Sequence, residues 1–583
     1  MSILIDYAGG NKVRIKRLLE SDTTWKKVSY RLHKLGTHYF KGYYMTALSN
    51  LLHISDSLDT SVVLSDSLFE VLCDNVALKL ERELGTQTRL EEACRTYLKP
   101  KGLRPFPHQV EASTWISGKD RSILALDPGL GKSAVAMMAI PENSPVLVIG
   151  PNISKTSWQK EIPLWRPDLN LTVIDKLADF RWPAPSEVVM CTFDGVPPTR
   201  EDIRKDATRK TKRYRNVKSF SELLDTFPEG MLLVIDEIHK ISNPNTSRYK
   251  RIDQIVTASV NRGNQIFGLT GTPLPNREEQ LWAVLRLLKL DQEVFGNKDN
   301  FYKMYGARKD RWGGWKFPPI EDRRMSEDIP LLLSNVMIRK TKKQVRPDLP
   351  DKVFQFLDVD LKQKSLTKKL QGAMASLKGF EDNDILNWLA SQPLGFEFIA
   401  GLRRDLAVAK IPFMLEMVED YEENQKPIVV ASAHRDPIEA LRDRKGWGVI
   451  TGSDSAKRRS EVAKKFMNGE LLGIGLTIQA GGVAISLNNT DEMIFVDLSW
   501  TPGDNTQAED RILRALLVDK GCLYKILTIN HPLERRVHEV LTRKTQAIET
   551  SIDSVALQRF VTDTQRLKEF LNTVKIYKKQ ILT

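Results

Sequence analysis

Short runs of apolar residues alternate with amphipathic stretches from Ser122 onward. The first five runs are SILAL, PVLVIG, EVVMCT, MLLVIDE and QIFGLTG, each bounded by glycine, proline or charged residues. Such runs are typical of strands buried on both faces of a parallel sheet, with crossover helices between them. The pattern resumes with PIVVASA, WGVITG, GIGLTI, EMIFVDL and CLYKILTI. We therefore predict two open α/β domains, at residues 98–290 and 353–543.

The other segments lack this alternation. Residues 291–352 contain the tryptophan pair of WGGW and the basic run MIRKTKKQVR, and we interpret them as a largely helical insertion or connector. Helical spacing predicts a protrusion at about 362–412, before the strands of the second domain, and a C-terminal helical brace at 544–583. Residues 1–97 show no strand and helix alternation, so we predict a small, separate N-terminal accessory domain.

Composition places the chain among ordinary folded proteins. Its 583 residues are 41% hydrophobic and 28% charged, which suits several globular domains. No apolar run reaches the ~18–20 residues of a membrane span, and a secretion signal is not recognisable, so we expect no membrane partner and an intracellular location. That location would be the cytoplasm or nucleoid of a prokaryotic or viral system, or a eukaryotic nucleus. Four cysteines without a C-x-x-C pair predict neither disulfides nor a zinc site.

Positive charge indicates a polyanionic partner. The formal net charge is +13, and basic side chains that neutralise phosphates release counterions, which favours binding to nucleic acid. Within residues 1–50, nine Lys or Arg and only three acids are interleaved with seven aromatic residues, a combination that suits backbone contacts and base stacking. A solvated face over an aromatic core is the alternative explanation. The candidate DNA contacts in this segment are Lys12, Arg14, Lys16 and Arg17.

A second basic segment, residues 201–220, holds eight Lys or Arg and three acids between two of the predicted strands. We expect a loop here. A DNA-facing loop and a disordered, solvated insertion are both consistent with this composition.

A phosphate-binding loop follows the first predicted strand. The run SILAL leads into residues 127–133, DPGLGKS, and then into the apolar helical pattern AVAMMAI. Gly129 and Gly131 allow the backbone N–H groups to turn toward phosphate. The Lys132 amine can reach the β and γ phosphates of ATP, and the Ser133 hydroxyl can bind Mg²⁺. The strict form of the motif has a glycine where this chain has Leu126.

Two acids complete the expected nucleotide site. The run MLLVIDE places Asp236 and Glu237 at the carboxyl end of an apolar strand, where ligands bind in open parallel sheets. Asp236 would hold Mg²⁺, and Glu237 would orient and deprotonate the attacking water. Acids at strand ends are often only solvated caps, but an upstream phosphate loop favours the catalytic interpretation.

In order along the chain, these motifs resemble those of the Swi/Snf-type ATPases of helicase superfamily two. The resemblance covers about residues 103–514 through blocks that include LRPFPHQ, LVIGPNISKTSWQKEIPLW, DEIHKISNPNTSR and LTGTPLPNREEQLW. It implies an α/β fold with two tandem RecA-like parallel-sheet domains and helical insertions. By the same resemblance, Gln109 and, more loosely, Arg104 recognise ATP. The residues that would couple the ATP state to the hold on DNA are His239, Thr270, Gly271 and Thr272.

The later blocks extend the resemblance into the second domain. The connector VMIRKTKKQVRPDLPDK resembles a block that is found in this family and rarely elsewhere, which disfavours an RNA or single-strand helicase. The resemblance implies that Gly481 and Gly482 belong to the coupling residues and that Gln507 binds ATP. It also implies that Arg511 and Arg514 reach ATP across the cleft between the domains. The candidate DNA contacts of the connector are Arg339, Lys340, Lys342 and Lys343.

Three departures from the family pattern mark a divergent branch. Leu513 stands where the family has a histidine, Ala515 and Leu516 replace a glycine-glutamine pair, and the glycine block reads AGGVAIS. The phosphate loop also carries Pro128 and Ser133 in place of the commonest residues. No departure removes a group that performs chemistry, so we expect an active ATPase. The short segments AVAKIPFM and WGGW resemble the annealing-helicase, fork-remodelling branch.

These patterns together predict an ATP- and Mg²⁺-dependent motor on double-stranded DNA. The basic, aromatic amino terminus adds an expected preference for branched DNA, so the expected function is branch migration, fork regression or annealing. A motor that displaces or slides DNA-bound proteins is the first alternative. A DNA-binding scaffold with an inactive ATPase is a second, which the complete set of Lys132, Glu237 and Arg514 disfavours.

Overall fold

The computed structural model divides into two compact units, which are described separately. The first contains Met1–Thr341 and Gln546–Thr583, and the second contains Lys342–Thr545. The described residues are 2–9, 12–19, 28–29, 32, 38–40, 43–47, 61–209, 214, 217–274, 278–309, 314–318, 324–348, 352–359, 395–479, 486–513, 521–529, 534, 537–538, 541–542, 545, 552 and 575–577.

A seven-stranded sheet forms the centre of the first unit, in the order β14-β6-β11-β10-β7-β9-β8, and all its pairings are parallel. The five predicted strands are confirmed, because a run of apolar residues can be buried on both faces of such a sheet. The strands are β6 Arg121–Leu126, β7 Val146–Gly150, β8 Asn170–Val173, β9 Glu187–Thr192, β10 Leu232–Ile235, β11 Ile266–Thr270 and β14 Met337–Lys340.

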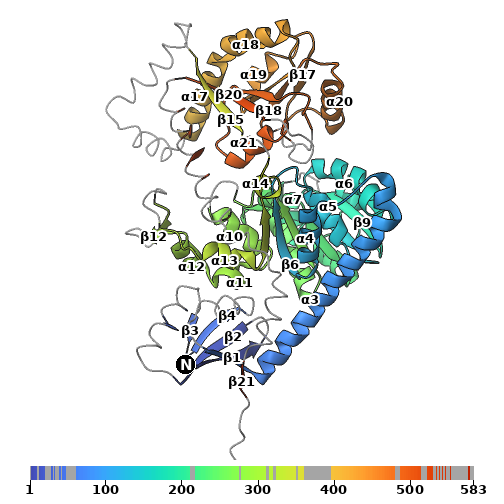
Figure 1. Ribbon diagram of the computed structural model, residues 1–583, viewed down its shortest axis with the longest axis vertical. Helices are drawn as coiled ribbons and strands as arrows, with labels where there is room; N and C mark the ends of the chain where they lie inside the picture. The colour runs from blue at the N-terminus through green and yellow to red at the C-terminus, as the bar shows by residue number, and fades with distance from the viewer. Residues whose placement is uncertain are drawn as a thin grey trace, which may run out of the picture. The chain divides into compact units, whose positions relative to one another are not determined.

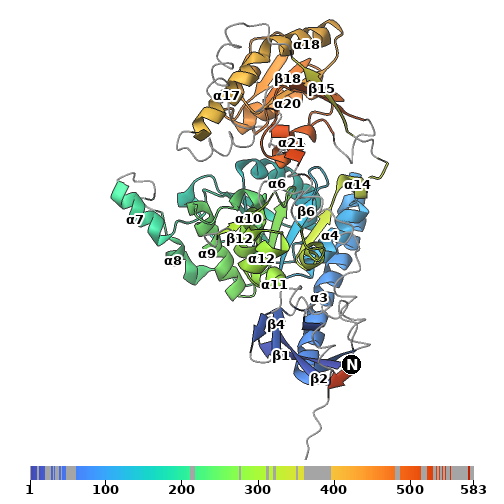
Figure 2. The same cartoon turned by 90° about the vertical axis from the view of Figure 1, so that its left-hand side faces the viewer.

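Helices cover both faces of this sheet. Figure 2 shows α4 and α9 on opposite sides of β6. Side chains from α9 and α10 pack into one large apolar cluster with β7, β10 and β11. The main helices are α4 Pro107–Ser117, α5 Lys132–Ala139, α6 Asn152–Trp165, α9 Ser247–Asn261 and α10 Glu278–Leu287.

The second unit is built on a six-stranded sheet in the order β15-β20-β19-β16-β18-β17, again with parallel pairings throughout. The five strands predicted here are also confirmed, and β15 is added at an edge. The strands are β15 Val353–Asp358, β16 Ile428–Ser432, β17 Trp447–Ile450, β18 Gly473–Thr477, β19 Glu492–Phe495 and β20 Leu523–Thr528. The helices are α17 Gly395–Ala409, α18 Ile411–Glu423, α19 Arg435–Glu439, α20 Ala456–Met467 and α21 Pro502–Glu509.

The amino-terminal segment forms a third sheet, in the order β21-β5-β1-β2-β4-β3. Val13 and Ile15 on β2 are fully buried, whereas Lys12 on the same strand is exposed, because side chains alternate between the two faces of a strand. The strands are β1 Ser2–Gly9, β2 Lys12–Leu19, β3 His38–Phe40, β4 Tyr43–Ala47, β5 Ser61–Ser65 and β21 Lys575–Tyr577.

The predicted N-terminal domain at residues 1–97 falls within the first compact unit. The 28-residue helix α3, Asp66–Ala93, starts at β5 and continues along the first unit (Figure 1). Arg82 pairs with Asp120 at 2.6 Å, and the Arg89 guanidinium donates to the Met138 carbonyl at 3.1 Å. These contacts join α3 to the residues that flank β6 and α5, so the helix belongs to the nucleotide-binding fold as much as to the N-terminal sheet.

Three further predictions differ from the structure. The connector at 291–352 contains the expected helices α11 Asp291–Phe295, α12 Lys298–Met304, α13 Ile329–Ser334 and α14 Lys342–Val345, but β14 is a strand of the first sheet. Within the expected helical brace, β21 is a strand that pairs with β5. Within the expected loop at 201–220, the helix α7, Arg200–Arg209, is stabilised by the Asp202–Arg251 ion pair at 2.8 Å.

Two other predictions concern segments that are only partly described. Residues 362–394 of the predicted protrusion lie outside the described residues, and α17 covers most of the part that follows. Among the described helices, none is both long and apolar enough to cross a membrane.

Candidate nucleotide-binding site

The phosphate loop connects β6 to α5, as the sequence predicts. Gly129 and Gly131 have φ angles of +87° and +84°, a left-handed conformation that L side chains rarely adopt. A Cβ atom on Gly131 would lie 2.2 Å from the Gln109 side-chain nitrogen, so a larger residue does not fit. The loop therefore depends on both glycines to bring its backbone N–H groups to the amino terminus of α5, where an anion is favoured.

Asp127, the first residue of the phosphate loop, contacts β14. The Arg339 guanidinium lies 2.7 Å from the Asp127 carboxylate and donates to the Ala125 carbonyl at 3.2 Å. The Asp127 N–H also donates to the Lys340 carbonyl at 3.0 Å. Arg339 is only 5% exposed. The charge of Arg339 is thus buried against the phosphate loop, and the DNA contact predicted for it stays a prediction that this burial disfavours.

The two predicted acids follow β10 directly. Asp236 is buried, and its carboxylate accepts from the Glu237 N–H at 2.9 Å and from the Trp158 indole at 3.4 Å. Burial and then the charge of Glu237 raise the pKa of Asp236, while the charge of Lys132 acts in the opposite direction. Glu237 has a φ of +50°, a conformation that costs a non-glycine residue energy and is often found at functional sites.

A short polar chain connects these acids to the end of β11. One ring nitrogen of His239, Nδ1, lies 3.3 Å from a Glu237 carboxylate oxygen and 2.9 Å from the Thr270 hydroxyl. The Thr270 hydroxyl accepts from the Thr272 N–H at 3.0 Å. Burial lowers the pKa of His239 to about 4, so the ring is neutral at physiological pH. A Cβ on Gly271 would lie 3.1 Å from the Lys132 amine, which places this turn against the phosphate loop.

Gln109 supports the phosphate loop from α4. Its side-chain nitrogen donates to the Leu130 carbonyl at 3.2 Å, and its oxygen accepts from the Phe106 N–H at 3.0 Å. His108, which sequence reasoning missed, also contacts the Leu130 carbonyl at 3.0 Å. Arg104 is exposed, three residues before α4. No sequence signal sets His108 apart, because its partner is a backbone atom 22 positions away.

These residues fit a magnesium nucleotide. Lys132 begins α5, and its amine donates to the Leu126 carbonyl at 3.1 Å. Ser133 follows it at the amino terminus of the helix, and Asp236 supplies a buried carboxylate. Hydroxyl and carboxylate oxygens are the ligands that Mg²⁺ prefers, and the glycine turn leaves room for phosphate oxygens.

The other predicted site residues belong to the second unit or are not described. Gln507 lies in α21 of the second unit, and Arg511 follows that helix. Arg514, Gly481 and Gly482 lie outside the described residues, so their predicted roles stay predictions.

The remaining candidate DNA contacts have different surroundings. On β2, Arg14 and Lys16 lie 3.3 and 3.8 Å from the Asp6 carboxylate, and the Arg17 side chain lies outside the described part. In the connector, Lys340 pairs with Glu111 at 3.0 Å. Lys342 is buried against Asp510, which also disfavours the DNA contact predicted for it. Lys12 and Lys343 are exposed.

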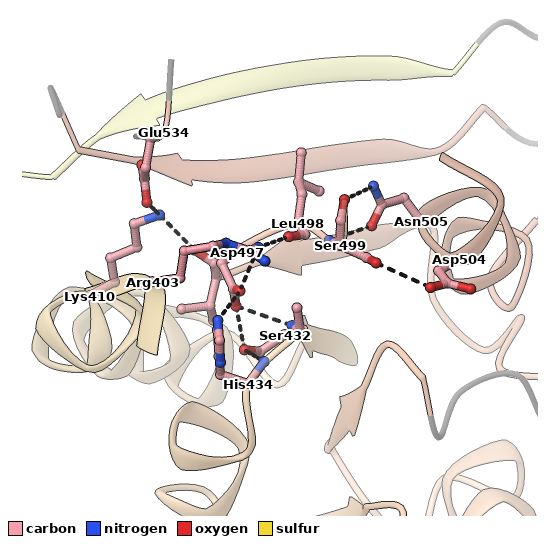
Figure 3. A network of polar contacts seen from close by, with 12 residues as sticks. Arg403, Lys410, Ser432, His434, Asp497, Leu498, Ser499, Asp504, Asn505 and Glu534 are labelled. Carbon is pink, nitrogen blue, oxygen red and sulfur yellow. Dashed lines mark hydrogen bonds and ion pairs between the residues drawn. The ribbon is translucent and has the colours of Figure 1, made fainter. Parts of the chain in front are cut away.

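A second polar cluster, also missed from the sequence, lies at the carboxyl ends of β16 and β19 (Figure 3). Asp497 accepts a hydrogen bond from Ser432 and lies 3.5 Å from a ring nitrogen of His434. Burial lowers the pKa of His434 against the opposing charge of Asp497. Lys410 is 1% exposed, donates to two backbone carbonyls at 3.0 and 2.7 Å and pairs with Glu534. These contacts fasten α17 and α18 to the sheet.

Comparison with known families gives two adjacent matches. Residues 108–379 match the SNF2-related domain, and residues 409–516 match the helicase conserved C-terminal domain. The first match begins at α4 and contains the phosphate loop, the two acids and the connector. The second contains the sheet of the second unit from β16 to β19, together with Gln507 and Arg511.

Several curated proteins are similar over most of this chain. An uncharacterized ATP-dependent helicase of Mycoplasma pneumoniae is 24% identical, covering 79% of this chain and 44% of its own length. The human DNA annealing helicase and endonuclease ZRANB3 is 24% identical over 74% of this chain and 39% of its own length. The Xenopus laevis SWI/SNF-related matrix-associated actin-dependent regulator of chromatin subfamily A-like protein 1 is 24% identical over 68% of this chain and 39% of its own length. The chain thus spans well under half the length of these relatives.

A solved structure is also similar. The Sulfolobus solfataricus SWI2/SNF2 ATPase core in complex with dsDNA is 19% identical and covers 80% of this chain and 98% of that one, with a TM-score of 0.32.

Proposed function

Because this chain belongs to the SNF2-related ATPases of helicase superfamily two, we propose that it hydrolyses ATP to move along double-stranded DNA. The observation that carries the proposal is the arrangement of Lys132 and Ser133 on the phosphate loop opposite Asp236 and Glu237 at the end of β10. A glycine turn, a lysine, a hydroxyl and two acids are the groups that nucleotide hydrolysis requires.

Each residue of the first unit has a distinct part in this proposal. The phosphate loop and Lys132 bind the phosphates, and Ser133 and Asp236 would hold Mg²⁺, which would supply positive charge beside the phosphates. Glu237 orients the attacking water and accepts its proton. Neutral His239, whose ring nitrogen lies 3.3 Å from the Glu237 carboxylate and 2.9 Å from the Thr270 hydroxyl, relays the state of the nucleotide to the turn after β11.

Hydrolysis in this proposal also requires the arginines of the second unit. Arg511 and Arg514 would stabilise the charge of the transferring phosphate, an effect worth roughly 10³–10⁵ in rate in related phosphoryl-transfer enzymes. A requirement for residues of both units makes hydrolysis depend on their arrangement, which is how a cycle of ATP binding and release drives stepwise movement.

The partner in this proposal is the phosphate backbone of duplex DNA, read with little sequence preference. The net charge of +13 supports a polyanionic partner, and contacts to phosphates carry no base information. The finer function is remodelling of branched DNA by branch migration, fork regression or annealing. Similarity to a human DNA annealing helicase supports this proposal. The basic side of β2, with Lys12, Arg14 and Lys16 opposite the buried Val13 and Ile15, supports it as well.

Two substitutions test the nucleotide site. Lys132→Ala removes a phosphate contact, so we expect weak ATP binding and no DNA-stimulated hydrolysis. Glu237→Gln removes only the carboxylate charge, so we expect normal ATP binding without turnover. Binding is measured with a fluorescent ATP analogue and turnover by phosphate release with linear duplex DNA. Normal turnover by either variant would show that the site lies elsewhere.

A charge reversal on β2 tests the preference for branches. Lys12→Glu/Lys16→Glu in the full chain should keep turnover on linear duplex but lose preferential binding and remodelling of forks and four-way junctions. Its affinity for junctions should also fall less steeply with salt, since ~0.9 counterions are released per phosphate neutralised. Lys160→Glu/Lys176→Glu makes the same charge change at exposed positions outside the N-terminal sheet and should behave as wild type. Unchanged junction activity of the β2 variant would instead favour a motor that displaces DNA-bound proteins.

A further inference from the structure

Two lysines of the connector hold a pair of acids in the second unit. Lys342 begins α14, and its amine lies 2.5 Å from an Asp510 carboxylate oxygen and 3.5 Å from the Leu513 carbonyl. Lys352, just before β15, lies 2.5 Å from Glu509 and 3.1 Å from the same Asp510 oxygen. The side chains of Lys342 and Asp510 are only 9% and 5% exposed. Buried charges of this kind persist in proteins when they are paired, as these are.

The electrostatics of the cluster are balanced. Burial alone would raise the pKa of Asp510, but the charges of Lys352 and Lys342 lower it. Burial alone would lower the pKa of Lys352, but Asp510 and Glu509 raise it well above its usual value. Asp510 and Lys352 therefore stabilise each other's charged form, and two lysines face two acids in the cluster. Loss of one lysine would leave a buried carboxylate without a matching charge.

The acids stand directly before the arginine motif. Glu509 ends α21, Asp510 follows it, and Arg511 is the next residue. The Glu509 carbonyl accepts from the Tyr524 hydroxyl at 3.1 Å, and the Arg511 carbonyl accepts from the Leu487 N–H at 2.8 Å. Hydrogen bonds to the Glu509 and Arg511 carbonyls, together with two lysines from the connector, thus fix the turn from which Arg511 extends.

We propose that Lys342, Lys352, Glu509 and Asp510 form a clamp that positions the arginine motif for ATP hydrolysis. The proposal rests on the proposed function of Arg511 and Arg514, and none of the four clamp residues contacts ATP in it. The same connector carries β14, whose Arg339 holds Asp127 of the phosphate loop in the first unit. The described connector residues therefore contact the phosphate loop in the first unit, through Arg339, and the turn before Arg511 in the second unit, through Lys342 and Lys352.

The test separates positioning from stability. Lys342→Met should lower kcat for duplex-stimulated ATP hydrolysis by ~10–100-fold, because a displacement of about 1 Å at a reacting group costs rates of that order, with KM for ATP within about twofold. The charge-balanced Lys342→Met/Asp510→Asn should regain thermal stability but not kcat, since the bond that fixes the turn is still absent. Lys525→Met removes a lysine from the Glu492 ion pair at 3.1 Å on the same sheet and should keep wild-type kcat.

A positioning role and a purely structural role of the cluster predict different results. Normal kcat in Lys342→Met, or recovery of kcat together with stability in the double variant, would show that the cluster only stabilises the fold. If Lys342→Met does not fold, Lys352→Met, which leaves the Lys342–Asp510 contact intact, and the double variant decide between the same two outcomes. A wild-type protein without DNA-stimulated hydrolysis would overturn the proposed function and this inference with it. A stimulated wild type with unaffected variants would overturn this inference alone.

Discussion

Arg339→Met should lower the free energy of unfolding of the first unit and leave the affinity for DNA nearly unchanged. The methionine side chain is close to arginine in length but carries no charge and no donors. It removes the 2.7 Å ion pair with Asp127 and the 3.2 Å bond to the Ala125 carbonyl, and it leaves the Asp127 carboxylate beside a buried apolar side chain.

The expected loss follows from the burial of the two partners. Removing one member of a fully buried ion pair costs about 3–5 kcal/mol. Arg339 is fully buried, but the Asp127 side chain is 21% exposed and can be partly rehydrated, so we expect about 2–4 kcal/mol. At roughly 2–4 °C per kcal/mol for a domain of this order of size, the Tm of the first unit should fall by ~5–15 °C.

Differential scanning calorimetry and DNA binding at several salt concentrations measure the two effects together. The exposed Lys160→Met is the control and should leave Tm within ~1 °C, because surface substitutions usually change stability by less than about 0.5 kcal/mol. A wild-type Tm for Arg339→Met, together with a salt slope reduced by ~1, would mean that Arg339 binds a phosphate. That result would refute the role assigned to β14.

Two further predictions concern the second unit. Hydrogen bonds from Lys426, Tyr421 and Lys525 overcome burial and lower the pKa of Glu492 to about 2, so its stabilising effect is complete above pH ~4.5 and is lost as pH falls toward 2. As the pH falls through this range, the free energy of unfolding measured with urea should therefore decrease by about 2–3 kcal/mol less in Glu492→Gln than in wild type. An identical pH profile in the two proteins would contradict the assignment. A Cβ on Gly473 would lie 2.4 Å from the Trp447 ring, so Gly473→Ala should cost about 1–3 kcal/mol. Gly452→Ala has nothing within 4 Å of the new Cβ, and equal unfolding midpoints for the two alanine variants would disprove the close contact.

The sequence predicted the two parallel sheets because burial on both faces requires continuous apolar runs. β6, β7, β10 and β16 have every or nearly every residue buried, and each was visible as such a run. β14 was missed because half of its residues are cations, and their partners Asp127 and Glu111 lie more than 200 positions earlier. β21 was missed because three residues give no periodic signal and its pairing with β5 is set by long-range contacts.

The nucleotide site was predictable because its groups are local to two strand ends. Lys132, Asp236 and Glu237 follow their strands directly, so motif and topology agree. The supporting roles of Arg339 and His108 were not predictable. Both residues bond to backbone carbonyls of the phosphate-loop region that are distant in sequence, so no local motif marks them. On β2, the alternation of Lys12, Val13, Arg14 and Ile15 is a period-two signal that would have identified the strand.

Displacement of a third strand from a linear DNA triplex tests the central claim most directly, since a protein that moves along the duplex strips the third strand as it passes. The wild-type protein should release the third strand only with hydrolysable ATP, at a rate that rises with ATP turnover. Glu237→Gln, which should bind ATP and DNA, should release none. A wild-type protein that hydrolyses ATP in the presence of duplex DNA but leaves the triplex intact would contradict movement along DNA.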